Sequence, residues 1–144
     1  MAKREFSDLK SMFTYLDQQA QSVLKQEVAK KTVEKMQQHI QSDVYDVYDP
    51  VLYERKGYNG GLIDEDSIEV GLVDDNTLYV ENIRFDGDRE VAEIVESGQG
   101  YTYDFLYNGV PRPFTENTRQ ELQQTGVLNE VMRNGLSRRG LDVK

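Results

Sequence analysis

Clustered carboxylates are the first residues of this sequence that could carry chemistry. Asp64, Asp66 and Glu69 lie close together, and further acidic residues follow at Asp74, Asp75, Glu81, Asp86 and Asp88. Such oxygen ligands suit Mg²⁺ or Ca²⁺, but the segment from Asp64 lacks the glycine at the sixth position and the glutamate at the twelfth of a calcium loop. We therefore expect no metal site, and we interpret these carboxylates as solvated turn residues.

Nucleophiles and proton-transfer groups are scarce. The chain has no cysteine and a single histidine, His39, which excludes thiolate chemistry and any reaction that needs two imidazoles. His39 lies near the end of an expected helix, where we expect it to interact with the helix dipole. Three glycines lie between Gly57 and Gly61, but no Gly-Lys-Ser/Thr follows to cradle a phosphate. We expect no catalytic residue and no cofactor.

Aromatic residues form the most distinctive cluster. Tyr101, Tyr103, Phe105 and Tyr107 alternate in a segment that ends in Pro111-Arg112-Pro113-Phe114. Tyrosine is enriched at protein interfaces, and base stacking would need basic neighbours that this segment lacks. We therefore favour a protein interface, with packing in the chain's own core as the alternative. Arg112 is held on a stiff backbone and could bind a carboxylate of a neighbouring subunit, or be solvated. The predicted interface comprises Glu96, Tyr101, Tyr103, Phe105, Tyr107, Arg112 and Phe114.

A long amphipathic helix is predicted from Phe6 to Ile40. Apolar residues recur there at steps of mostly three and four, with no Gly or Pro between them. Ser7 is expected to be its N-cap. At ~1.5 Å per residue the helix is on the order of 50 Å long. That length exceeds what a globule of this size needs, so the helix either bends or leaves the body.

The next region is predicted to be rich in β-structure. Valine and tyrosine alternate irregularly after Ser42, which favours strand, and the glycines from Gly57 to Gly61 form a loop. The clearest β pattern follows: apolar residues alternate from Ile68 to Leu72, Asp74-Asp75-Asn76 forms a turn, and Leu78 and Val80 continue the alternation. This pattern predicts an antiparallel hairpin with one buried face.

The C-terminal part is predicted to be helical. A short helix from Arg89 to Ser97 ends at Gly98, and the aromatic segment separates it from a last helical region. Thr115 is expected to cap that region and Gly140 to end it, and residues 141–143 could add an edge strand. The fold class is therefore α+β: a long N-terminal helix, a small antiparallel sheet, and a C-terminal helix packed on the sheet.

Charge is distributed unevenly along the 144 residues. The net charge is −9; residues 1–41 and 111–144 each carry +2, and residues 42–110 carry −13. We expect one domain over 1–144, made of a long helix (1–41), an acidic β-rich region (42–110) and a C-terminal helical region (111–144). The acidic region would repel DNA, and no apolar run is long enough to predict a membrane segment or signal peptide.

Three short motifs accompany this order of elements: Gly60-Gly61-Leu62, Val95-Glu96-Ser97-Gly98 and Arg112-Pro113-Phe114. With these motifs, the chain resembles the tail-completion or minor tail component family of tailed phages and prophages. The chain departs from that family's pattern in its Asn-Gly-Gly-Leu turn and its tyrosine-rich segment. The resemblance implies a non-enzymatic subunit of the neck, made in the host cytoplasm and incorporated into the virion, and leaves head-to-tail joining, tail termination and a prophage remnant open.

The partners implied are copies of the chain itself in a ring, for which a hexamer is one candidate, together with connector and tail-tube proteins. DNA would pass through as cargo, with the acidic region facing the channel, and no membrane is involved. Two alternatives from other classes are an acidic protein that mimics DNA to inhibit a nucleic-acid-binding protein, and a metal-dependent hydrolase that uses Asp64, Asp66 and Glu96.

Overall fold

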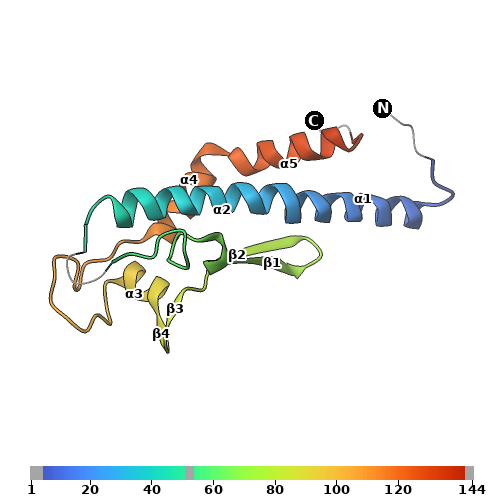
Figure 1. Ribbon diagram of the computed structural model, residues 1–144. Coiled ribbons are helices and arrows are strands. Elements are labelled where there is room, and N and C mark those ends of the chain that lie inside the picture. The colour runs from blue at the N-terminus through green and yellow to red at the C-terminus, as the bar shows by residue number, and fades with distance from the viewer. Residues whose placement is uncertain (1–4, 51–53, 142–144) are drawn as a thin grey trace.

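One long helix forms the spine of the molecule. The computed structural model describes residues 5–50 and 54–141. The helix runs without a break through α1 (Leu9–Val23), the π turn η1 (Leu24–Val28), α2 (Ala29–His39) and a second π turn, η2 (Ile40–Tyr45). Only the start of α1 extends beyond the other described elements (Figure 1). The predicted helix is confirmed, and it leaves the body instead of bending back.

The two ends of this helix differ from the prediction. Asp8, not Ser7, is the N-cap, and its side chain accepts a hydrogen bond of 2.7 Å from the backbone N–H of Ser11. The strand predicted after Ser42 is wrong: the residues up to Tyr45 are helical, and residues 46–50 form a turn and an irregular segment. Met36, Ile40 and Val44 recur every fourth residue and are all buried, so packing of this stripe overrides the β preference of valine and tyrosine. Val51 lies outside the described residues.

The first π turn keeps the apolar stripe aligned. Val23 and Val28 are five residues apart, yet both are buried, at 0% and 5% exposure. A regular α-helix would rotate residues at this spacing away from each other, whereas a π turn holds an extra residue. The stripe therefore faces the body on both sides of η1.

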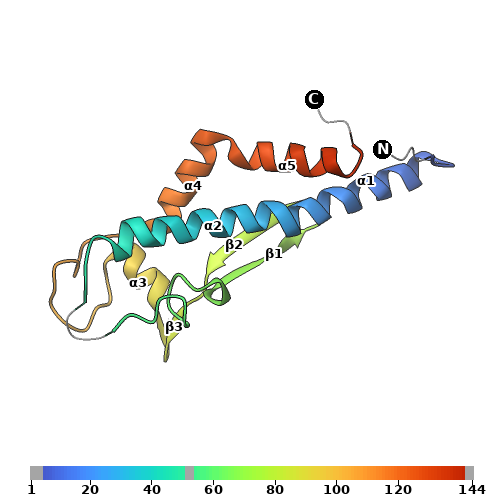
Figure 2. The same ribbon diagram turned by 45° about the horizontal axis from the view of Figure 1, so that its top comes forward.

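The hairpin consists of β1 (Ile68–Asp74) and β2 (Thr77–Asn82), which pair antiparallel with Val70 opposite Val80. The predicted hairpin and turn are confirmed. Only its base is buried, however: Ile68 is 6% exposed, whereas Val70 is 42% and Val73 70% exposed. Figure 2 shows the hairpin extending from the body beside the long helix. A smaller part of the hairpin is therefore buried than the alternating pattern predicted.

The remaining elements follow in the predicted order. A short ribbon of β3 (Phe85–Asp86) and β4 (Arg89–Glu90) leads into α3 (Val91–Ser97). Gly98 ends α3 in the left-handed conformation, as predicted, and a Cβ there would lie 2.5 Å from the carbonyl carbon of Val110. The glycine is therefore required both for its φ of +75° and for the close approach of the following loop.

Two helices, not one, form the C-terminal region. They are α4 (Phe114–Thr125) and α5 (Val127–Arg138), separated by Gly126. Both pack chiefly against the long helix, on the side away from α3 (Figures 1 and 2). The helical stretch ends at Arg138, near the predicted Gly140. Leu141 belongs to no strand, and the other residues of the predicted edge strand lie outside the described part of the chain.

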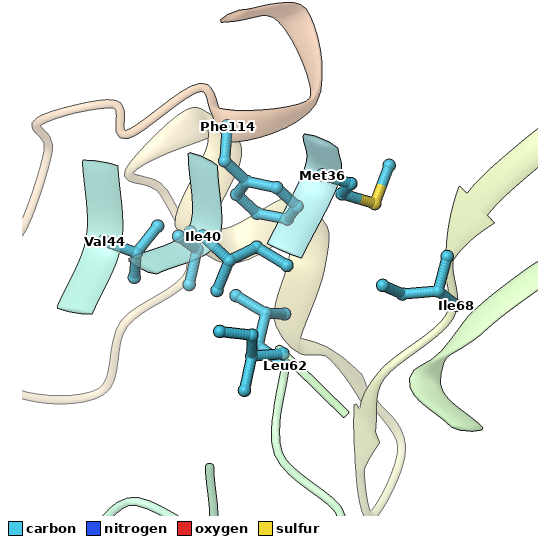
Figure 3. Packing of buried hydrophobic residues seen from close by; sticks show 8 residues of the cluster. Met36, Ile40, Val44, Leu62, Ile68 and Phe114 are labelled. Carbon is cyan, nitrogen blue, oxygen red and sulfur yellow. The ribbon is translucent and has the colours of Figure 1, made fainter. Parts of the chain in front are cut away.

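The core lies at the C-terminal end of the long helix. Figure 3 shows the Phe114 ring against the helix stripe, with Leu62 on the far side. The segment around Leu62 is irregular, and side chains satisfy its backbone: Gln37 Nε2 donates to the Ile63 carbonyl at 2.9 Å, and Asn82 Nδ2 to the Leu62 carbonyl at 2.8 Å. These bonds tie the segment to both α2 and the hairpin. The core residues are Met36, Ile40, Val44, Leu62, Ile63, Ile68, Val95 and Phe114.

Candidate interaction surfaces

The aromatic loop (residues 99–113) folds around one ring. Phe105 lies 4.7 Å from Tyr101, 5.1 Å from Tyr103 and 5.2 Å from Tyr48, measured between ring centroids. Tyr107 completes the cluster and donates from its hydroxyl to the Val47 carbonyl at 3.3 Å. The predicted aromatic residues are therefore brought together, and Tyr48, which sequence pattern did not associate with them, joins them. All are half-buried, so each ring has one packed side and some accessible surface.

Arg112 lies beneath this loop and is only 7% exposed. Its Nη2 donates to the Tyr101 hydroxyl at 2.8 Å, its Nη1 approaches the Val44 carbonyl at 3.5 Å, and its guanidinium lies 4.6 Å from the centre of the Tyr107 ring. The positive charge thus meets the free carbonyls at the end of the long helix. Arg112 is thus enclosed by the chain, so the interpretation of a solvated side chain is wrong.

Phe114 is wholly buried at 0% exposure, which corrects its place in the predicted interface. A side chain with no exposed surface cannot contact a partner, and Phe114 contributes instead to the core. The sequence motif Arg-Pro-Phe therefore marks a junction between loop, core and α4.

Glu96 links α3 to α4. Its carboxylate accepts a hydrogen bond from the backbone N–H of Thr115, in the first turn of α4. Thr115 was expected to cap this helix, but it lies inside the helix and is itself capped by Glu96 from another element. Burial raises the pKa of Glu96, and repulsion by Glu116 and Asp43 adds to the effect, against the hydrogen bonds from Thr115.

His39 connects the long helix to α4, which its position in the sequence did not indicate. Its Nδ1 lies 2.7 Å from Asp43 Oδ2 and its Nε2 lies 3.2 Å from Glu121 Oε1. Lys35 binds Glu121 at 3.0 Å and thereby lowers the pKa of that carboxyl. The helix continues past His39, so the expected interaction with a helix end is replaced by this network of charges.

An apolar groove runs between the long helix, the hairpin and the C-terminal helices. Its volume is about 600 Å³, and its apolar lining includes Leu24, Val28, Leu78, Leu122, Leu128 and Met132. These residues come from four elements, η1, β2, α4 and α5, so no local pattern could predict that they share a surface. The groove is a concave hydrophobic surface of the kind that partners bind.

Further apolar residues are exposed on the part of the long helix that extends from the body. Leu9 is 67% exposed and Phe13 57% exposed. They belong to the same amphipathic pattern whose continuation in α2 forms the core. The pattern thus extends beyond the part of the helix that the chain itself covers.

Asp64, the first of the clustered carboxylates, forms hydrogen bonds with the backbone around it. Asp64 accepts backbone N–H groups of Gly60 at 2.7 Å and Asp66 at 2.9 Å, so it organises a turn. Within the described ranges, no three His, Cys, Asp or Glu side chains are grouped as metal ligands would be. Nor does that part of the chain contain a helix long and apolar enough to cross a bilayer.

Comparison with known proteins places the chain in a family. The YomN family model matches residues 8–138. The chain belongs to the YomN family. A relative is the SPbeta prophage-derived protein YomN of Bacillus subtilis (strain 168), which is 37% identical over 108 residues, covering 73% of this chain and 73% of the relative. No solved structure matches significantly.

The YomN match includes every surface described above. Residues 8–138 contain the long helix, the hairpin, the aromatic loop and both C-terminal helices. The phage association that the element order implied is thus supported by a prophage-derived member of the family. The family assignment does not extend to the tail-completion role that the resemblance implied.

Proposed function

We propose that this protein is a non-enzymatic structural subunit of a tailed-phage neck, which completes the tail or joins head to tail by packing beside copies of itself in a ring. The apolar groove carries the proposal. A monomer leaves this groove and the exposed Leu9 and Phe13 uncovered. Apolar surface of this kind is buried favourably against another protein.

The shape of the molecule supports head-to-tail contacts. The extended helix and hairpin lie toward one end, and α3 and the aromatic loop toward the other (Figure 1). Contacts between unlike surfaces generate rings when the rotation closes. Tyr101, Tyr103, Phe105 and Tyr107 present half-buried rings at the second end and are the proposed contact residues there, with Glu96 and Arg112 holding the loop in place beside them.

Charge and ancestry are consistent with this role. The relative derived from the SPbeta prophage supports a phage function for this chain. The −13 charge of residues 42–110 suits a surface past which DNA moves without binding. The proposed partners are further copies, connector proteins and tail-tube proteins, first in the host cytoplasm and then in the virion.

Mass measurement tests the proposal. Native mass spectrometry of the purified chain, alone and mixed with the connector and tail-tube proteins encoded beside it, should show a closed oligomer in at least one sample. Leu128→Lys places a charge in the groove and should abolish that oligomer, whereas Asn134→Lys, on an exposed position of the same helix, should not. A chain that stays monomeric in every mixture contradicts the proposal.

A further inference from the structure

The cationic side chains of the acidic region gather in one place. Residues 42–110 contain four Lys or Arg residues: Arg55, Lys56, Arg84 and Arg89. All four line a single pocket of about 450 Å³ together with Arg112, and we call it the arginine pocket. Five positive side chains thus converge inside the segment whose overall charge is the most negative.

The described carboxylates form no ion pair with the cations of this pocket. Glu54 and Asp86 line it too, but no ion pair within 4 Å joins either of them, or any other described carboxylate, to the five cations. The guanidinium groups instead donate to backbone carbonyls, as Arg55 does to Tyr45 at 2.9 Å and Arg89 to Gly100 at 3.1 Å. These bonds leave the net positive charge in place.

Arg112 gives the strongest indication that the arginine pocket binds an anion. Its side chain is more than nine-tenths buried, and its Nε has no acceptor among the described residues. A buried charge is unfavourable unless it is paired and its donors are satisfied. A carboxylate entering the pocket would supply the missing negative charge to Arg112 and to the more exposed Arg84 and Arg89.

The turn of the hairpin offers the matching surface. Asp74 and Asp75 are exposed at the turn, and Val73 beside them is 70% exposed. Backbone and side-chain hydrogen bonds from Asn76 and Thr77 lower the pKa of Asp74, which keeps it charged. The arginine pocket combines its cations with apolar walls from Leu62, Ile94 and Val95. Both the charge and the apolar character of the two surfaces are complementary.

We propose that the arginine pocket receives the acidic hairpin turn (residues 73–76) of a second copy of this chain. The hairpin points away from α3 and the β3–β4 ribbon in both views, and none of the pocket's described lining residues belongs to β1 or β2 (Figures 1 and 2). Each copy therefore has one turn and one pocket, and its own turn does not reach its own pocket. The inference rests on the proposed ring and specifies its contact.

Charge exchange between two variants tests the contact. The pocket variant carries Arg84→Glu with Arg89→Glu. The turn variant carries Asp75→Lys with Asp74→Asn, since asparagine can still accept the bond from the Asn76 N–H that Asp74 accepts at 2.8 Å. Each variant alone brings like charges together and should associate at least about thirtyfold more weakly than the wild type.

Mixing the two variants should restore association. In an alternating assembly, the acidic pocket of one variant meets the basic turn of the other, and the basic pocket meets the acidic turn. Native mass spectrometry should then show oligomers with equal numbers of the two variants. Lys25→Glu with Lys30→Glu, a reversal of two exposed charges on the long helix, is the matched control and should associate as the wild type does.

The outcomes separate this inference from the proposed function. Wild-type oligomers that persist in both variants, or that the mixture fails to restore although each variant keeps its far-ultraviolet circular dichroism spectrum, would overturn the contact and leave the ring intact. Absence of any wild-type oligomer would overturn both. Binding of short duplex DNA by the wild type, lost in the pocket variant while self-association is unchanged, would also overturn the contact.

Discussion

Glu96 joins two helices through one carboxylate, and its charge state should affect stability. Because burial raises its pKa above the ordinary 4.5, the folded chain holds this proton more tightly than the unfolded chain. The contribution of Glu96 to the free energy of unfolding therefore falls as pH rises above 4.5. Glu96→Gln keeps an acceptor for the Thr115 N–H and removes the charge, so the variant should gain stability relative to the wild type between pH 4 and pH 7.

Thermal denaturation at several pH values measures this difference. Glu96→Ala removes the acceptor altogether and should lose about 0.5–2 kcal/mol at every pH in the range, which is typical of a lost helix cap. A stability difference between wild type and Glu96→Gln that does not change with pH would show that the carboxylate does not titrate in a buried environment.

Phe114 should dominate the core, since it is one of the largest side chains that the structure buries completely. Phe114→Ala removes its contacts with the long helix and leaves a cavity, at an expected cost of roughly 3–5 kcal/mol. Phe85→Ala is the matched control, because Phe85 is 46% exposed and its loss should cost less than about 1 kcal/mol. Urea denaturation provides both values, and similar losses in the two variants would contradict the assignment of Phe114 to the core.

At the scale of elements, α5 approaches the long helix closely at one glycine. A Cβ on Gly135 would lie 2.6 Å from Val23 Cγ1 and 2.7 Å from Glu27 Oε2. Gly135→Ala should therefore force the helices apart and cost about 1–3 kcal/mol, although alanine favours an isolated helix. Asn134→Ala, at the exposed neighbouring position, should be neutral or slightly stabilising. A melting temperature that rises in Gly135→Ala would show that the helices do not meet as described.

Sequence patterns predicted correctly the elements that are determined by neighbouring residues. Alternation from Ile68 and the turn at Asp74 gave the hairpin, and Gly98 gave the end of α3. The end of the long helix was missed because Val44 is held in the core cluster, whose other members include residues far along the chain such as Phe114. The cap of α4 was misplaced for the same reason, since its acceptor, Glu96, comes from another helix.

The candidate surfaces divide in the same way. The aromatic loop was found because its rings alternate within a few residues, and the cluster around Phe105 follows that local spacing. The apolar groove and the arginine pocket were not found, because their residues come from separate elements and only the fold brings them together. The place of Arg112 was misjudged, since nothing local indicates that Tyr101 and Val44 enclose it.

At the scale of the whole molecule, stability and assembly should depend on different ends of the long helix. Of the long helix, only residues of α2 and η2 belong to the core cluster, and none of α1 does. The exposed Leu9 and Phe13 are thus not required for folding, but they provide apolar surface for a neighbour. Leu9→Ser with Phe13→Ser should leave the melting temperature of the monomer within about 2 °C of the wild type.

The same double variant should lose association, because removing the apolar side chains removes the driving force for covering this end of the helix. Sedimentation velocity over a range of protein concentrations measures the weakening. Ser11→Ala with Asp17→Ala, which alters exposed polar positions of the same helix, controls for changes in helix propensity. A variant that melts at a much lower temperature would assign Leu9 and Phe13 to the fold, whereas unchanged association would remove the extended helix from the proposed contact between copies.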